Sequence, residues 1–217
     1  MERSLSLTIK NDKKATDLHL YAYRNDRENV IKYLDKNEGQ INTRDSKGKT
    51  ALFLASSYGR QEIVDIMLKR SVCDPNIPDN KGNTPLHEAV EKGDLNIAKS
   101  LVDSGRCSVC IKNTYNQSPL MRAVYYDYPE IARLLHKHGA DLNEIDENGL
   151  SPLLLGLKEG STRVVDYVIR NSCDVNVLDK DGHSALFEAI FSPYISSLDP
   201  AKALLEHEIV YLFIIVQ

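Results

Sequence analysis

The sequence predicts an all-α solenoid of stacked helix-turn-helix units joined by hairpin loops. A phrase of the form "GNTPLHEAVEKGD", which begins at Gly82, occurs five times, and in most copies a second segment with apolar residues at helical spacing follows it. The hydroxyl residues that anchor the copies are separated by steps of 34, 34, 33 and 33 residues: Thr50, Thr84, Ser118, Ser151 and Ser184. Self-similarity at such a period is typical of stacked repeats.

Each copy begins with the signals that start a helix. The anchoring Ser or Thr suits the N-cap, where its oxygen accepts a hydrogen bond from a backbone N–H that lacks a partner within the helix. In three copies the next residue is a proline, which is favoured at the first helical position: Pro85, Pro119 and Pro152. A glycine then suits the left-handed position that ends a helix: Gly59, Gly93 and Gly160.

A second helix follows in each unit. It is visible as "EIVDIML", "NIAKSLV", "EIARLLH" and "RVVDYVI", where apolar residues recur at helical spacing. Polar turns such as "DSKGK", "DNKGN", "DENGL" and "DKDGH" connect the units. Because Asp, Asn and Gly favour tight turns, we expect these segments to form hairpin loops.

The phrases "NTPLHEAVEKGDLNIAKSLVDSG" and "HGADLNEIDENGLSPL" closely resemble the ankyrin repeat family. They match its Thr-Pro-Leu-His and Gly-Ala-Asp-x-Asn patterns at the 33-residue period of that family. The resemblance covers roughly residues 15–207, with five recognisable repeats after a degenerate first one. In the first unit the register is ambiguous by one residue, because either Thr16 or Ala22 can be aligned with the second repeat.

This organisation predicts three parts of the chain. We expect a flexible amino-terminal segment at 1–14, an ankyrin repeat domain at 15–208 and an apolar tail at 209–217. The predicted repeat boundaries are 15–45, 46–79, 80–113, 114–146, 147–179 and 180–208. The tail "IVYLFIIVQ" stands where a polar segment would be expected, and three interpretations stay open: a cap on the last repeat, the foreign end of a truncated or spliced chain, or a docking segment for a partner.

Thr84, His87 and Glu88 have the residue types of a nucleophile, a base and an acid. The positions equivalent to His87 hold hydrophobic residues in the other copies: Phe53, Met121, Leu154 and Phe187. The resemblance implies instead that His87 braces a neighbouring loop by hydrogen bonds, and Glu88 is expected on the helix surface. With no phosphate-binding loop or other catalytic motif, the sequence predicts no enzymatic activity and no cofactor.

The cysteines do not form a recognisable metal site. Cys107 and Cys110 have the spacing of half a zinc site, but the sequence offers no second pair of ligands, so we expect no metal. Three cysteines fall in the small slot that Ala140 occupies in another repeat: Cys73, Cys107 and Cys173. Free cysteine fills such a slot as a modest hydrophobe.

Composition limits the classes of partner. The 27 Lys and Arg residues nearly balance the 31 Asp and Glu residues, so we expect no direct nucleic-acid binding. The segment "MERSLSLTIKNDKK" has no apolar run long enough for a signal peptide, and no later segment approaches the ~20 apolar residues that span a bilayer, so we expect no membrane insertion. Four cysteines in 217 residues agree with a reducing compartment. We expect a monomer in the cytoplasm, with a nuclear location as a further option.

The resemblance implies that the function is protein binding by a non-catalytic scaffold or adaptor. In ankyrin repeat proteins the hairpin tips and the exposed face of the first helix contact partner proteins. The corresponding positions predict partner-binding residues on this concave surface: Tyr58, Lys92, Tyr115, Arg122, Tyr125, Tyr126, Leu150 and Lys158. The middle repeat stands out, since interface hot spots are enriched in Tyr and Arg. The alternative is that some of these rings pack against adjacent repeats or cover the turn at Asp127.

Other functions of ankyrin repeat proteins remain open. The chain could be an inhibitor of a transcription factor or a substrate adaptor of a ubiquitin ligase, although it lacks an evident phosphodegron, an acidic tail and a further carboxyl-terminal box. It could also be a substrate of an asparaginyl hydroxylase. The candidate target residues are Asn76 and Asn143, which stand eight residues after Leu68 and Leu135 in leucine-led segments.

Overall fold

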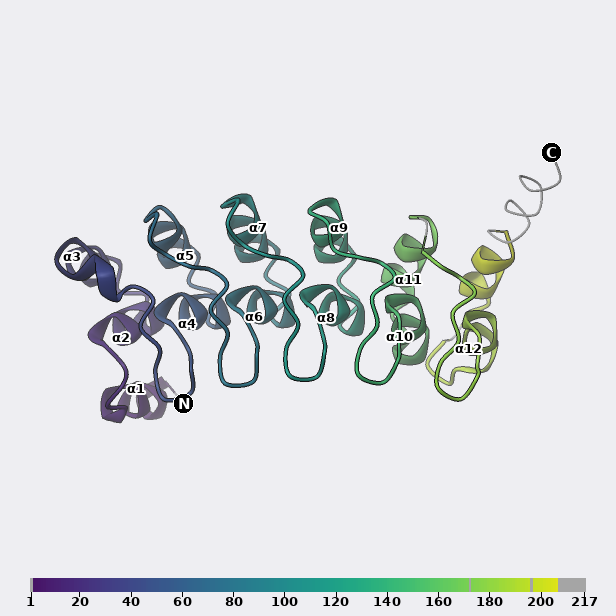
Figure 1. The fold of residues 1–217 in the computed structure, drawn as a ribbon, viewed down its shortest axis with the longest axis horizontal. Helices are drawn as coiled ribbons and strands as arrows, with labels where there is room; N and C mark the ends of the chain where they lie inside the picture. Colours follow the sequence, from purple (N-terminus) through teal and green to yellow (C-terminus); the bar gives the residue numbers. More distant parts are fainter. Residues whose placement is uncertain (1, 172, 196, 207–217) are drawn as a thin grey trace. The chain divides into compact units, whose positions relative to one another are not determined.

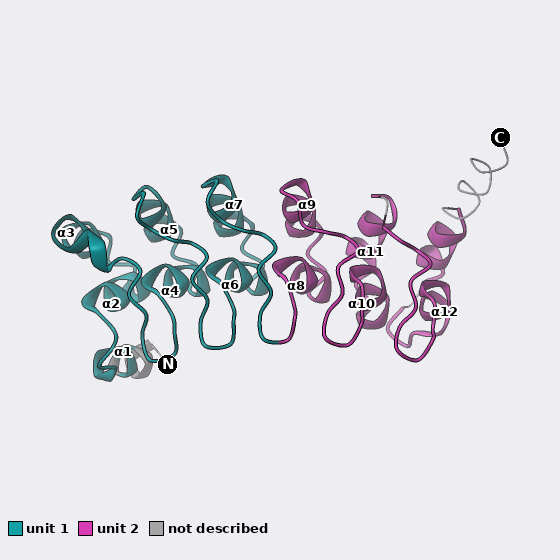
Figure 2. Ribbon diagram, viewed as in Figure 1, with its two compact units in different colours: residues 1–114 teal, residues 115–217 magenta. Residues whose placement is uncertain are grey.

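The computed structural model describes residues 2–171, 173–195 and 197–206, and it divides into two compact units. Unit 1 covers residues 1–114 and unit 2 covers residues 115–217 (Figure 2). The described residues form helices, turns and one isolated antiparallel bridge between Leu178 and Ser184. The predicted all-α fold class is therefore confirmed.

Unit 1 contains paired short helices. Its elements are α1 (Glu2–Asn11), α2 (Asp17–Arg24), α3 (Arg27–Asn37), the 3₁₀ helix η1 (Glu38–Gln40), α4 (Ala51–Ser57), α5 (Gln61–Leu68), α6 (Pro85–Glu91) and α7 (Leu95–Asp103). The first helices α2, α4 and α6 pack against one another, and the second helices α3, α5 and α7 form a parallel layer beside them (Figure 1). The core of the unit lies between these two layers.

Unit 2 repeats the arrangement. Its elements are α8 (Pro119–Tyr125), α9 (Pro129–Lys137), α10 (Pro152–Glu159), α11 (Thr162–Ile169) and α12 (Ala185–Phe191), and residues 199–206 are also helical. Helix α10 packs against both α8 and α12, while α9 packs against α11. None of the helices in the described ranges is both long and apolar enough to cross a membrane. The predicted repeat boundaries stay a prediction, with these helices falling inside them.

The hydroxyl N-caps that the sequence predicts are confirmed. Thr50 Oγ1 accepts from Phe53 N at 3.1 Å, and Ser118 Oγ accepts from Met121 N at 3.2 Å. Ser151 and Ser184 cap α10 and α12 in the same way. Each cap satisfies a backbone donor in the first turn, which explains why such short helices begin at a fixed residue.

The structure differs from the prediction of a flexible amino-terminal segment. Residues 2–11 of the segment predicted to be flexible form α1, which packs against α2. Ser6 is buried and accepts from Arg24 Nη2 at 2.7 Å, while Asp12 Oδ2 accepts from Ser46 N at 2.9 Å. These contacts come from residues far along the chain, so the local sequence of the segment gives no sign of them.

The first repeat has the register that begins at Thr16. Thr16 is the N-cap of α2, and its N–H donates to His19 Nδ1 at 3.1 Å. His19 Nε2 lies 3.1 Å from the carbonyl oxygen of Lys49 in the next loop, to which it donates. Burial lowers the pKa of His19, which keeps the ring neutral and able to accept at Nδ1.

The last repeat, which contains α12, exposes positions that are buried in the repeat that contains α8. Met121 and Val124 of α8 are 1% and 0% exposed, whereas their equivalents Phe187 and Ile190 of α12 are 39% and 49% exposed. Leu204 is buried. The predicted apolar tail at 209–217 lies outside the described residues. Among the described residues, the outer face of α12 therefore remains apolar and open to solvent.

Candidate protein-binding surface

The side chains of α8 form the most distinctive exposed group in unit 2. Arg122, Tyr125 and Tyr126 lie at the carboxyl end of this helix, where Tyr125 is 49% and Tyr126 38% exposed. The two tyrosine rings meet edge to face, with centroids 5.0 Å apart and an interplanar angle of 85°. Tyr115 lies in the turn before α8 and is also exposed.

Tyr128, the N-cap residue of α9, extends this group. Its ring stacks on that of Tyr126 at 5.9 Å with an interplanar angle of 23°. Both rings flank Asp127, whose backbone φ of 54° lies in the left-handed region that glycine occupies in other copies. Tyr126 therefore makes ring contacts within its own repeat, while 38% of its surface stays open to solvent. We call Arg122, Tyr125, Tyr126 and Tyr128 the α8 patch.

Two predicted residues lie in unit 1. Tyr58 packs edge to face on Tyr23, with ring centroids 4.8 Å apart, and keeps 38% of its surface exposed. Burial raises the pKa of the Tyr58 hydroxyl, so this group stays protonated at neutral pH. Lys92 is exposed at the carboxyl end of α6. Tyr58 thus combines a packing contact with an open face, and Lys92 is open to solvent.

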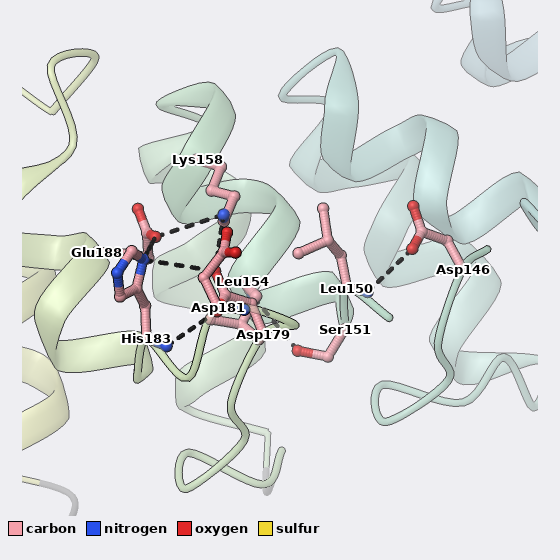
Figure 3. A network of polar contacts seen from close by, with 9 residues as sticks. All are labelled: Asp146, Leu150, Ser151, Leu154, Lys158, Asp179, Asp181, His183 and Glu188. Carbon is pink, nitrogen blue, oxygen red and sulfur yellow. Dashed lines mark hydrogen bonds and ion pairs between the residues drawn. The ribbon is translucent and has the colours of Figure 1, made fainter. Parts of the chain in front are cut away.

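Lys158 belongs to a polar network that the sequence did not predict (Figure 3). Its Nζ lies 2.8 Å from Asp179 Oδ2 and 3.4 Å from Glu188 Oε1. The hydrogen bond from Lys158 holds the pKa of Asp179 at about 2, and that same bond raises the pKa of Lys158. Since two carboxylates surround its ammonium group, Lys158 is less able to attract a partner than an isolated lysine.

His183 closes this network on the side of α12. Its Nδ1 lies 3.3 Å from Glu188 Oε1, and its ring stacks on Phe187 at 4.1 Å. Ligand atoms of Asp179, Asp181 and His183 lie within 4.8 Å of one another, a set that could hold a cation. The ammonium of Lys158 already occupies the place beside Asp179, so the group fits an ion-pair network better than a metal site.

Leu150 lies in the hairpin turn before α10, the helix that carries Lys158, and is half-buried. Its N–H donates to Asp146 Oδ1 at 2.9 Å, and its carbonyl oxygen accepts from Asp146 N at 3.1 Å (Figure 3). These bonds close the hairpin turn before α10. The exposed part of Leu150 offers only a small apolar contact to a partner.

The residues that resemble a catalytic triad serve the fold. Thr84 N–H donates to His87 Nδ1 at 3.1 Å, and His87 is fully buried at the start of α6. The expectation that Glu88 lies on the helix surface is wrong. Its side chain is buried and accepts from Ser57 Oγ of α4 at 2.6 Å. The sequence did not predict the burial of Glu88, because its hydrogen-bond partner Ser57 lies in the neighbouring repeat.

The two candidate asparagines make hydrogen bonds between repeats. Asn76 is half-buried, donates from Nδ2 to the carbonyl of Arg106 at 2.8 Å, and accepts from Ser108 N at 2.7 Å. Asn143 is exposed and accepts from Asp174 N at 2.7 Å. Access to the Asn76 side chain therefore requires local opening of the loop, and Asn143 is the more accessible of the two.

Burial disfavours the reactive thiolate form of three of the four cysteines. Cys73 and Cys173 are buried as predicted, whereas Cys107 is half-buried and Cys110 exposed. Burial raises the pKa of Cys73 and of Cys107 to about 12, and that of Cys173 to about 11. Since the thiolate is the nucleophile, these three groups are poor candidates for catalysis.

Comparison with protein families gives one match across nearly all of the chain. The profile described as ankyrin repeats, in three copies, matches residues 4–79, 68–146 and 120–212. Among solved structures, an ankyrin repeat domain from Acinetobacter baumannii AYE has a TM-score of 0.81 and 24% identity. That match covers 88% of this chain and 97% of the other. At this identity it bears on the fold alone.

Curated relatives share only part of the sequence. Human transient receptor potential cation channel subfamily A member 1 is 33% identical over 69 residues, which are 32% of this chain and 6% of that protein. Ankyrin repeat protein nuc-2 of Neurospora crassa is 33% identical over 78 residues, which are 34% of this chain and 7% of that protein. The chain therefore spans less than a tenth of the length of either relative.

Proposed function

This chain belongs to the ankyrin repeat family, and we propose that it is a non-catalytic scaffold or adaptor that binds a partner protein through its first helices and hairpin tips. Ankyrin repeats are in general protein–protein interaction modules. The observation that carries the proposal is the α8 patch, where Tyr125 and Tyr126 stay 49% and 38% exposed although apolar ring surface favours burial.

The chemistry of the α8 patch is that of an interface hot spot. Tyrosine offers a large apolar ring with a polar hydroxyl and few rotatable bonds, so it loses little entropy on binding. The contact between Tyr125 and Tyr126 restrains both rings before a partner arrives. Such preorganisation lowers the entropic cost of association. Arg122 on the same helix adds a cation that can pair with a carboxylate of the partner.

The family fold is typically non-catalytic, and neither the profile nor the matched structure points to a catalytic family. The Thr84, His87 and Glu88 side chains are engaged in capping and inter-repeat contacts. We propose a monomer located in the cytoplasm, the nucleus or both. The more specific roles, as an inhibitor of a transcription factor or as an adaptor of a ubiquitin ligase, would use the same surface.

Affinity capture with matched variants tests this proposal. The intact chain, a Tyr125→Ala/Tyr126→Ala variant and a Tyr194→Ala variant are used side by side to capture proteins from a lysate. Tyr194 is 70% exposed and lies outside the α8 patch, so it controls for the loss of a surface tyrosine. We expect one partner that the intact chain and Tyr194→Ala retain and the double variant loses.

Thermal melting of all three proteins separates binding from folding. An unchanged melt together with loss of the partner supports the α8 patch as the interface. Equal capture by all three proteins would refute a role for this patch. A double variant that unfolds at a much lower temperature would show that the rings act in packing, which also contradicts the proposal.

A second candidate function is that of a hydroxylation substrate, and the exposure of Asn143 favours that residue over Asn76. Hydroxylation adds 16 daltons, so peptide mass spectrometry of protein isolated from oxygenated cells measures it directly. We expect the larger modified fraction at Asn143. The absence of the mass shift at both asparagines would exclude this function.

A further inference from the structure

The hairpin tips of unit 1 carry a group of basic residues. They lie in three short segments, 12–14, 44–49 and 79–81, and comprise Lys13, Lys14, Arg44, Lys47, Lys49 and Lys81. All except Lys49 are exposed, and Lys49 is half-buried. We call these six residues the basic tip cluster. No residue of the cluster is part of the α8 patch.

Hydrogen bonds between repeats bring the three segments together. Ser46 N donates to Asp12 Oδ2 at 2.9 Å, which joins the first segment to the second. Asn80 N donates to the carbonyl of Lys47 at 2.9 Å, and Asn80 Nδ2 donates to the carbonyl of Ser46 at 3.0 Å. The basic residues are therefore neighbours on a fixed backbone, although up to 68 positions separate them in the sequence.

Arg44 adds hydrogen bonds that hold the hairpin tips together, and no carboxylate neutralises its charge in these bonds. Its Nε donates to the carbonyl of Gly48 at 3.0 Å, and its Nη2 lies 3.4 Å from Asn80 Oδ1. Both acceptors are uncharged. The guanidinium is thus held in place at the tips, while its positive charge remains available to an anionic partner.

The carboxylates of the same segments are used by the turns themselves. Asp45 Oδ1 accepts from the backbone N–H groups of Lys47 and Lys49 at 2.9 and 2.8 Å. Asp79 Oδ1 accepts from Lys81 N at 2.9 Å in the same manner. The bond with Ser46 holds the pKa of Asp12 at about 2, so this group stays ionised in its place.

As a result, the cations of the cluster lack carboxylate partners. Within the described residues, none of the six basic side chains forms an ion pair, and in these three segments they outnumber the carboxylates two to one. The Nζ of Lys49 lies 4.7 Å from the ring centroid of Phe53. This contact orients the lysine but does not neutralise its positive charge. The tips of unit 1 are therefore locally positive on a chain whose formal net charge is −4.

The geometry points to a docking site for an acidic, extended segment of a partner protein at the basic tip cluster. This inference rests on the proposed protein-binding function and names the chemistry of one contact. Outside these three segments, residues 1–114 hold 13 Lys and Arg residues and 13 Asp and Glu residues, so the excess of positive charge in unit 1 is confined to the cluster. A short peptide with several Asp or Glu residues matches a site of this size. A long nucleic acid or an anionic membrane would extend over a surface with no net positive charge.

A direct titration tests the inference. The intact chain is titrated into a fluorescein-labelled peptide of about twelve residues rich in Asp and Glu, and fluorescence anisotropy reports binding at low and at physiological salt. The test variant is Lys13→Gln/Lys47→Gln/Lys81→Gln. The control variant is Lys36→Gln/Lys69→Gln/Lys99→Gln, which removes the same charge from exposed positions on, or directly after, the second helices of unit 1.

We expect the test variant to bind the peptide at least tenfold more weakly than the intact chain, and the control variant to bind within about twofold of it. The salt dependence of binding should also decrease in the test variant only, because fewer contacts with charge remain. Equal weakening in both variants would overturn the inference, since it would show an effect of net charge. Absence of binding by the intact chain would overturn it as well.

Two further arms address the other anionic classes. Single-stranded DNA of similar charge and vesicles containing phosphatidylserine are titrated under the same conditions. If the chain binds the DNA or the vesicles more tightly than the peptide, the result would contradict the proposal of an acidic protein segment as the ligand. Tyr125→Ala/Tyr126→Ala serves as a separate control and should bind the peptide normally. Failure of the peptide arm therefore leaves the test of the α8 patch unaffected, and the reverse also holds.

Discussion

Asp127 Oδ1 accepts a hydrogen bond from the backbone N–H of Val164 at 3.0 Å, so a turn residue of one repeat caps the second helix of the next. The N-cap residue of α11, Ser161, makes no such bond with its own side chain. Asp127 also replaces the glycine that ends the first helix in other repeats and takes a φ of 54°. This one residue therefore joins the turn beneath the α8 patch to the following repeat.

Replacement of Asp127 by glycine should reduce stability even though glycine tolerates this φ better. We expect Asp127→Gly to lower the free energy of unfolding by about 1 kcal/mol, because the N–H of Val164 loses its cap. Asp127→Asn keeps an oxygen acceptor and tolerates the left-handed region, so it should change stability by a few tenths of that value. Urea unfolding measures both. A glycine variant as stable as the parent would show that the cap contributes nothing.

Arg106 should be important for the stability of unit 1. Its guanidinium donates to the carbonyl oxygens of Leu68 at 2.6 Å and Ser71 at 2.9 Å, at the carboxyl end of α5. We expect Arg106→Ala to lower the free energy of unfolding by about 2 kcal/mol, since several carbonyls lose a charged donor at once. Arg27→Ala, at an exposed position, is the control. Similar losses in both variants would contradict this role.

Gly156 and Val165 form a size-matched pair in unit 2. A Cβ at Gly156 would lie 2.7 Å from Val165 Cγ2 and 3.2 Å from Val124 Cγ1. Valine in a helix has one strongly preferred rotamer and cannot easily move away. We therefore expect Gly156→Ala to cost about 1 kcal/mol, although alanine is the better helix former.

The same change should become favourable once Val165 is shortened. Two equivalent pairs, Ala89 with Ala98 and Ala123 with Ala132, hold two alanines, and a third combines Ala55 with Val64. In a Val165→Ala background, Gly156→Ala should raise the free energy of unfolding by about 1 kcal/mol. A double-mutant cycle followed by urea unfolding measures this change of sign. The same destabilisation in both backgrounds would exclude the proposed clash.

The ion pair of Asp179 with Lys158 should make stability depend on pH. The folded pKa of Asp179, about 2, lies below its ordinary value of 3.8, so the unfolded chain takes up this proton first as the pH falls. The stabilisation is fully present above about pH 4 and is lost as the pH falls towards 2. The stability difference between the parent and Asp179→Asn should therefore be largest near pH 6 and shrink below pH 4. Denaturant unfolding over this range measures it, and a constant difference would contradict it.

The sequence predicted the repeats because their signals are local. A hydroxyl cap and a proline at the first helical position act within one turn, so Ser118 and Pro119 could be interpreted without knowledge of the neighbours. The aromatic residues of α8 were found in the same way. Their exposure could be expected from their position in the repeat, since Tyr125 and Tyr126 follow the buried apolar positions of the helix.

Contacts between distant residues were missed for the opposite reason. Glu88 is buried because Ser57 donates to it from the preceding repeat. The position of Lys158 depends on Asp179 and Glu188 in the following one. Helix α1 is held by Arg24 through Ser6. In each case the partner lies 18 or more residues away, and only the stacked fold brings the two groups together.

Site-specific photocrosslinking tests most directly whether the α8 patch contacts a partner. A benzophenone amino acid replaces Tyr125 in one preparation and Tyr194 in another, and both proteins are irradiated in a lysate or with the captured partner. We predict a covalent adduct with the partner from position 125 and none from position 194. An adduct from Tyr194 alone, or equal adducts from both positions, would contradict binding through α8.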